Sequence, residues 1–176
     1  MCNRCSCYLC KKIFVMDKIY GATARQDSLE QTGRQKWCLI YGFGKDEPTQ
    51  EYGWNYRKTY DHKPSIEEIK TDIIGQINED TDAKILQGFV WNNMTVWLSS
   101  ENQFNYKAAY DLAVQTNSAS LPVIFKFGTE DEPHYHKFST LDELADFYTK
   151  AIAYMQQILA DGWKEKDSID WTQFEI

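Results

Sequence analysis

The chain has 176 residues and a net charge of −7, and 43% of its residues are hydrophobic and 15% aromatic. This length suits one globular domain with short extensions, and the apolar content can form a core, which excludes an intrinsically disordered chain. No apolar stretch approaches the roughly 20 residues of a membrane span, so no membrane segment is predicted. The acidic balance argues against binding to nucleic acid or to an anionic membrane surface.

Four of the five cysteines lie within the first ten residues. They are Cys2, Cys5, Cys7 and Cys10. Four thiolates are suited to zinc or to an iron–sulfur cluster, which makes these residues weak metal-site candidates. However, one residue separates the two C-x2-C pairs, whereas zinc sites usually place roughly a dozen or more residues between them. We favour the other interpretation, in which Met16 is the natural start and residues 1–15 are an upstream translated extension.

Charge and composition divide the chain into three parts. Residues 1–36 carry seven basic and three acidic side chains, a net charge of +4, which leaves −11 for the remainder. We therefore expect residues 1–35 to be a polar, cysteine-containing leader and residues 36–162 to be a single α+β domain. Residues 163–176 are expected to be a polar tail, either a loose end or a docking segment.

The domain is predicted to begin with two strands and a helix. The β-branched and aromatic residues of 36–42 predict a buried strand, and residues 52–60 predict a second strand. Pro64 ends this strand, and Ser65 with Glu68 three residues later forms a capping box that predicts a helix start. An isoleucine stripe at helical spacing continues to about residue 78.

The same order is predicted twice more. Residues 85–91 and 95–98 read as strands joined at Asn92-Asn93, a pair that tolerates the positive φ of a tight hairpin. The helix that follows, 100–115, is predicted to open on a Ser100–Gln103 capping box. Its expected apolar seam consists of Phe104, Ala108 and Leu112.

The third repeat has strands at 121–127 and 134–138, followed by a helix. We expect Ser139 and Thr140 to cap this helix and Gly162 to end it. The order of the predicted elements thus indicates an α+β fold in which a strand–strand–helix unit occurs three times. An antiparallel sheet built from hairpins, with the three helices packed mainly on one face, would bury these apolar seams.

The residues that could carry chemistry have simpler structural explanations. His134 and His136 lie on one strand face beside an acidic turn, where solvated histidines are ordinary. His62 is expected in a turn, and Cys38, in the middle of a strand, as a small buried hydrophobe. The residues around Gly44-Lys45 lack phosphate-loop spacing. The sequence therefore predicts a protein that is not an enzyme and that has no cofactor.

An aromatic ladder is the strongest candidate for a binding site. Alternation on the strand at 52–60 places its aromatic side chains on one face, and Trp91 adds further aromatic area. The ladder consists of Tyr52, Trp54, Tyr56 and Tyr60. We favour a place for it in the core. If it faces solvent instead, it could stack on sugars or anchor a protein partner.

Several stretches resemble small uncharacterised proteins encoded among bacteriophage and prophage tail genes, over roughly residues 50–165. The similarity is carried by residues 85–91 (ILQGFVW), by 96–105 (VWLSSENQFN), which lead into a helix, and by 121–123 and 138–141 with the long helix that ends at Gly162-Trp163. Residues 56–57 and 64–69 fit the same group. The cysteine-rich start lies outside the resemblance, which brings no known active residues.

The resemblance implies a non-enzymatic structural or accessory protein that makes protein–protein contacts in a tail or tail-fibre context. Its expected partners are other phage structural or assembly proteins, with no nucleic acid and no membrane, and it is compatible with a homo-oligomer. The implied location is the virion or the bacterial host cytoplasm. The alternative function is a carbohydrate-binding module that uses an exposed aromatic ladder.

Overall fold

The computed structural model describes residues 16–129 and 131–175. Two compact units make up the chain: unit 1 comprises Met1–Gln76 with Ile169–Ile176, and unit 2 comprises Ile77–Ser168. The expected single domain of 36–162 is therefore divided between two units. The four N-terminal cysteines proposed as metal ligands, Cys2, Cys5, Cys7 and Cys10, lie outside the described residues.

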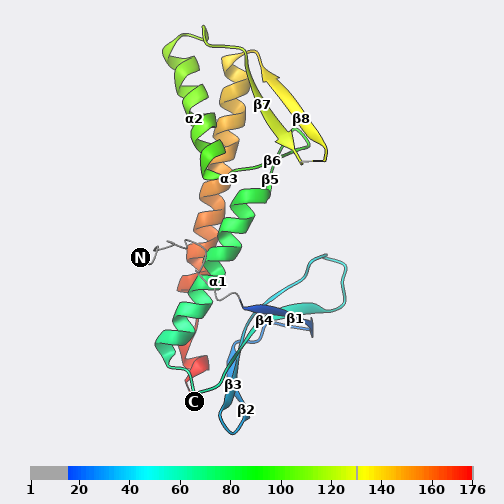
Figure 1. Cartoon of the computed structure of the whole chain (residues 1–176), viewed down its shortest axis with the longest axis vertical. Coiled ribbons are helices and arrows are strands. Elements are labelled where there is room, and N and C mark those ends of the chain that lie inside the picture. The colour runs from blue at the N-terminus through cyan, green and yellow to red at the C-terminus, as the bar shows by residue number, and fades with distance from the viewer. Residues whose placement is uncertain (1–15, 130, 176) are drawn as a thin grey trace, which may run out of the picture. The chain divides into compact units, whose positions relative to one another are not determined.

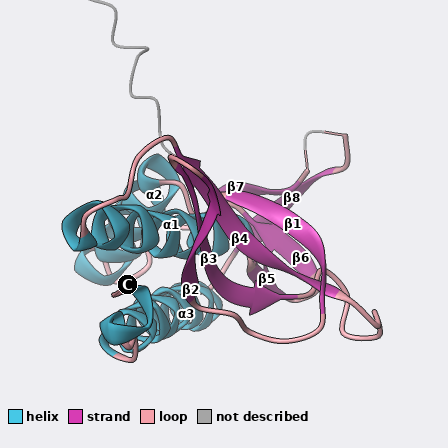
Figure 2. Cartoon of the chain, turned by 90° about the horizontal axis from the view of Figure 1, so that it is seen from below, coloured by secondary structure: helices cyan, strands magenta, loops and turns pink. Residues whose placement is uncertain are grey.

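Unit 1 contains a four-stranded antiparallel sheet in the order β1-β4-β3-β2. Figure 2 shows these strands side by side. Their bounds are β1 (Asp17–Ala22), β2 (Ser28–Gly33), β3 (Lys36–Gly44) and β4 (Gly53–Tyr60). The two expected strands, β3 and β4, pair with each other in the centre, with Trp37 opposite Tyr60 and Tyr41 opposite Tyr56.

The segment expected as a polar leader supplies both edge strands of this sheet. β1 pairs with β4, and β2 pairs with β3. Sequence pattern did not indicate β1, because nearly all of its side chains are exposed and no apolar alternation marks it. In β2 only Leu29 is buried. These edges form because β3 and β4 offer unpaired backbone groups on their outer sides.

Helix α1 (Ile66–Gln87) begins in unit 1. The expected capping box is present, since the Ser65 amide donates to Glu68 Oε2 at 2.8 Å and the Glu68 amide to Ser65 Oγ at 3.3 Å. Ile69 and Ile73 are fully buried. The expected C-terminal tail docks in unit 1, because Phe174 in the short 3-10 helix η1 (Trp171–Phe174) is buried.

Unit 2 consists of two hairpins and the helices that cover them. The elements are β5 (Phe89–Trp91), β6 (Met94–Val96), α2 (Ser100–Gln115), β7 (Val123–Gly128), β8 (Pro133–Phe138) and α3 (Leu141–Asp167). β5 pairs with β6, and β7 with β8, each as a separate two-stranded antiparallel sheet. Asn92 and Asn93 have φ of 45° and 62°, as the hairpin prediction requires.

The C-terminal ends of two helices differ from expectation. The stretch 85–87, predicted as strand, continues α1, because the Tyr154 hydroxyl donates to the Lys84 carbonyl and Gly88 lets that ring approach. α3 passes through Gly162 and ends five residues later, at Asp167. Gly162 lies within α3 and faces α1, and a Cβ atom at residue 162 would lie 2.6 Å from Thr81 Oγ1. Close helix packing, rather than a C-cap, explains this glycine.

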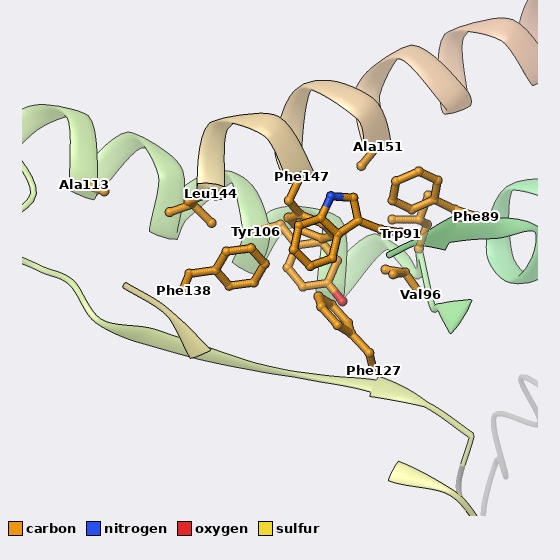
Figure 3. Packing of buried hydrophobic residues seen from close by; sticks show 11 residues of the cluster. Phe89, Trp91, Val96, Tyr106, Ala113, Phe127, Phe138, Leu144, Phe147 and Ala151 are labelled. Atoms are coloured by element: carbon orange, nitrogen blue, oxygen red, sulfur yellow. The ribbon is translucent and has the colours of Figure 1, made fainter. Parts of the chain in front are cut away.

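The core of unit 2 is aromatic and centres on Phe147 of α3. Its ring centroid lies 5.0 Å from that of Tyr106, 5.2 Å from that of Phe127 and 5.4 Å from that of Trp91. Figure 3 shows these rings converging from α2, β7 and β5 on α3. The Trp91 indole, which is fully enclosed, donates a hydrogen bond to Asp146 Oδ2 at 3.1 Å.

The fold class is thus α+β, with three helices and antiparallel strands in which strand–strand–helix occurs three times after the two edge strands. The strands form three separate sheets rather than the expected one. The reason is that β5–β6 and β7–β8 use their apolar faces to pack on helices, and each ends without a third strand among the described residues.

Phe147→Ala should lower the free energy of unfolding of unit 2 by about 3–5 kcal/mol, because removal of a buried phenylalanine ring leaves a cavity in a close-packed core. The matched control is Tyr135→Ala on β8, whose ring is 65% exposed and whose loss should change stability by no more than about 0.5 kcal/mol. Urea unfolding followed by circular dichroism measures both. Equal losses in the two variants would contradict the central role of Phe147.

Candidate functional site

The side chains of the aromatic ladder and Trp91 do not form one exposed binding surface. Tyr52 lies just before β4 and is 51% exposed, whereas Tyr56 and Tyr60 are 5% and 8% exposed. Trp91 is 2% exposed and belongs to the core of unit 2. Three of these five candidates therefore serve as core residues, and Trp54 is the candidate within β4 that stays partly exposed.

The remaining strand tryptophan, Trp54, already has close neighbours. Its indole N–H donates to Asp46 Oδ1 at 3.1 Å, and Lys18 Nζ lies 4.1 Å from its ring centroid. On Gly44 a Cβ would lie 2.2 Å from the ring, so the indole packs directly on this backbone. Tyr20 also donates to Asp46, which lowers the pKa of the carboxyl and raises that of the phenol.

An open groove of about 860 Å³ lies in unit 1 between β4 and α1. Inside it, Lys58 Nζ lies 2.6 Å from Asp72 Oδ1, and the Tyr60 hydroxyl donates to Asp72 Oδ2. Burial, followed by the hydrogen bond to Asp72, raises the pKa of Tyr60 far above its ordinary value. Because these groups satisfy one another, the cluster fastens α1 to the sheet.

A second charged cluster lies at the rim of this groove. His62 Nδ1 is 2.9 Å from Asp61 Oδ1, and His62 Nε2 is 3.0 Å from Glu68 Oε1. These two carboxylates raise the pKa of His62. The backbone N–H of Ser65, together with His62 and the Ser65 hydroxyl, lowers the pKa of Glu68 to about 2. The Glu68 carboxylate, held by His62 and Ser65, therefore caps the first turn of α1, where a negative charge complements the helix dipole.

The two histidines of β8 differ in their surroundings. His136 Nε2 lies 2.9 Å from Glu143 Oε1, and the ring packs edge-on against Trp91 at 4.9 Å. His134 is exposed at the start of β8. Within residues 16–129 and 131–175 there is no group of three or more His, Cys, Asp or Glu side chains that could hold a metal ion.

The surface of α2 differs from expectation in a way that bears on function. The predicted seam of Phe104, Ala108 and Leu112 faces outward, with Phe104 71% exposed and Leu112 50% exposed. Tyr106 and Ala113 are the buried residues of this helix. Tyr106 takes the inward position, where its ring makes tilted and edge-on contacts with Phe125, Phe127 and Phe147.

Beside Phe104 lies an apolar groove of about 260 Å³ between α2 and α3. Figure 1 shows these two helices side by side within unit 2. From α3 the groove is lined by Tyr148, Ile152 and Met155, and one turn farther along Leu159 is 36% exposed. We call Phe104, Tyr148, Ile152, Met155 and Leu159 the α2–α3 surface.

Charged side chains are few around the α2–α3 surface: Lys107 of α2, which pairs with Asp111, lines the groove, and part of α3 has none. Residues 151–160 of α3 contain no lysine, arginine, aspartate, glutamate or histidine, although several of these positions are exposed. The exposed positions include Ala153, Gln156, Gln157 and Ala160. Depletion of charge together with exposed apolar and aromatic residues is typical of the core of protein–protein interfaces.

Sequence reasoning assigned these α3 residues to the apolar side of an amphipathic helix. Tyr148 and Met155 do pack, partly buried, against the core of unit 2, whereas Leu159 is exposed. Phe104 was expected in the core through the seam of α2 and is exposed instead.

Comparison with known proteins assigns no relative: no family model, no curated protein and no solved structure matches this chain. No helix among the described residues is both long and apolar enough to cross a membrane.

Asp72→Leu should lower the free energy of unfolding by about 3 kcal/mol, because it leaves the Lys58 ammonium and the Tyr60 hydroxyl in the groove without their carboxylate. The control is the double variant Lys58→Met with Asp72→Leu, which removes both charges and should recover most of the loss. Denaturant titration of the three proteins measures the difference. A double variant as unstable as Asp72→Leu would show that the ion pair is not the cause.

Glu68→Gln should lower the pKa of His62, measured by NMR titration of its ring protons, because one of its two carboxylate partners is lost. Glu67→Gln is the matched control, since Glu67 pairs with Lys70 instead. An equal shift of the His62 pKa in both variants would contradict the contact between His62 and Glu68.

The shifted pKa values of Glu68 and His62 make the stability of the fold depend on pH in opposite directions. Glu68 contributes its full stabilisation of the folded state above its ordinary pKa of 4.5, and this contribution is lost as pH falls toward 2. His62 stabilises fully below its ordinary pKa of 6.5, and its contribution is lost as pH rises through its raised value.

Proposed function

We propose that this protein is a non-enzymatic structural or accessory component of a bacteriophage or prophage tail or tail fibre, and that it acts through protein–protein contacts. Its partners would be phage structural or assembly proteins, met in the virion or in the host cytoplasm. Nucleic acid and membrane are not among the proposed partners, since the chain is acidic.

The observation that carries this proposal is the α2–α3 surface. Phe104 is 71% exposed beside a mainly apolar groove, and residues 151–160 of α3 have no charged side chain. Apolar area left in contact with water costs free energy, so a contiguous exposed patch on a folded unit favours a binding role. The tail context is supported by the resemblance of residues 50–165 to proteins encoded among phage tail genes.

Carbohydrate binding has less support. A stacking site needs an aromatic ring with a free face, and Tyr56, Tyr60 and Trp91 are buried. The Trp54 ring is contacted by Lys18 and by the Gly44 backbone. Tyr52 is the one member of the ladder with half of its side chain exposed.

The test is whether the chain is incorporated into tail particles through this surface. In cells that carry the phage or prophage that encodes it, tagged wild-type chain should co-purify with assembled tails at a fixed stoichiometry, measured by quantitative mass spectrometry. Phe104→Glu should reduce this incorporation at least tenfold, because it places a charge at the centre of the apolar surface.

Ile124→Glu is the matched control. Ile124 is 59% exposed on β7, outside the α2–α3 surface, so this variant should be incorporated like wild type. Wild-type chain absent from purified tails and from their assembly intermediates would refute the proposed function. Equal incorporation of the two variants would refute the assignment of the contact to α2 and α3.

A further inference from the structure

We infer that a second pocket of unit 2, beside Trp97, binds a neutral pyranose sugar. The pocket has a volume of about 350 Å³, within the range of small-molecule sites, and is lined by residues from the start of α2 and the end of β7. Phe127, a buried member of the aromatic core, is one of them, so the packing of unit 2 helps to fix its shape. The pocket shares no lining residue with the groove beside Phe104. It is thus a separate site, beyond the proposed function, with a different kind of ligand.

Trp97 is held in a fixed place at the surface of unit 2. Its two neighbours in the chain, Val96 and Leu98, are fully buried, whereas Trp97 is 40% exposed. The Asn102 side chain donates to the Trp97 carbonyl at 3.0 Å. Gln103 donates in the same way to the Leu98 carbonyl at 2.6 Å. An aromatic residue whose backbone is fixed before a ligand arrives loses little conformational freedom on binding.

The Trp97 indole is not occupied by other described parts of the chain. It makes no aromatic, cation–π or hydrogen-bonding contact with the residues that the structure describes. The ring of Trp54, by contrast, is contacted by Lys18 and by Gly44. The C–H groups on one face of a pyranose ring are apolar and pack on an accessible indole, a requirement that the buried members of the aromatic ladder do not meet.

The polar groups of the pocket suit the hydroxyl groups of a sugar. Ser99 Oγ accepts from the Asn102 amide at 3.2 Å, which leaves its O–H free to donate. Thr129 Oγ1 accepts from the Glu132 amide at 3.0 Å and likewise keeps its proton. Asn102 uses its Nδ2 within the protein and keeps its side-chain oxygen as an acceptor. A sugar hydroxyl both donates and accepts, so it can satisfy both kinds of group.

The surrounding charges favour a neutral sugar over an acidic one. Lys126 lines the pocket, but Asp131 and Glu132 lie in the connection from β7 to β8, and Glu101 lies in the first turn of α2. These carboxylates disfavour an anion. A carboxylate or phosphate would also offer acceptors alone and leave the Asn102 oxygen without a donor.

The test uses the purified full-length chain. The neutral probes are the methyl pyranosides of glucose, galactose, mannose and N-acetylglucosamine, and glucuronic acid is the acidic comparison. Proton–nitrogen NMR resolves the indole N–H signals of the six tryptophans, and Trp97→Phe identifies that of residue 97 by its loss. At least one neutral probe should shift this signal in a saturable way. Glucuronic acid should bind more weakly than the glucoside.

Affinities of the variants are measured by calorimetric titration with the neutral probe that binds. Trp97→Ala should weaken binding by about tenfold or more because the stacking surface is lost, and Trp97→Phe, which keeps an aromatic face, should retain most of it. Trp163→Ala is the matched control. Trp163 is 59% exposed on α3 and does not line the pocket, so this variant should bind like wild type. Circular dichroism and melting temperature show whether each variant is folded.

Three results would overturn the inference. They are the absence of a saturable shift of the Trp97 signal with every neutral probe, an affinity that Trp97→Ala leaves unchanged, and equal losses in Trp97→Ala and Trp163→Ala. Tighter binding of glucuronic acid than of the glucoside would overturn the choice of a neutral ligand. Phe104→Glu separates this site from the proposed function. Since Phe104 does not line the pocket, that variant should bind the sugar like wild type even when it fails to enter tails.

Discussion

The packing of aromatic rings around Phe147 is the interaction on which unit 2 depends. A two-stranded hairpin is marginal by itself in water, and unit 2 contains two of them, β5–β6 and β7–β8. Each places a ring against Phe147, Trp91 from the first hairpin and Phe127 from the second (Figure 3). The long helix α3 thereby joins elements that have no strand pairing with each other among the described residues.

This constraint also determines what α2 exposes. A helix can turn only one side toward Phe147, and Tyr106 fills that side at 5.0 Å. Tyr110 stacks on Tyr148 at 4.9 Å and holds α2 in the same rotation. Phe104 must then point away from the core. The exposed position of Phe104 is therefore a consequence of how the aromatic core of unit 2 is packed.

The two units use their charged groups differently. In unit 1 one groove holds a cluster of ionic groups, where Asp72 accepts from Lys58 and Tyr60 and where His62 bridges two carboxylates. These contacts link helix to strand and cap a helix. In unit 2 the most notable electrostatic feature is the stretch of α3 that has no charge at all. A role in protein contacts agrees with both.

Local sequence was sufficient for the features that neighbouring residues decide. Ser65 and Glu68 marked the start of α1, Thr140 caps α3 through the Glu143 amide, and the Asn92-Asn93 turn adopts positive φ, because each depends on atoms only a few residues apart. The α+β class and the strand–strand–helix order followed from the same local patterns.

The tertiary structure alone decided which side of an amphipathic element is inside. The stripe of Phe104, Ala108 and Leu112 has the spacing of a core seam, yet the bulk of Tyr106 turns it outward. Gly162 resembles a helix stop but permits a close crossing with Thr81. β1 has no apolar pattern and forms by pairing with β4. In each case the deciding partner lies far away in the chain, so its size and its unpaired backbone groups cannot be inferred from nearby residues.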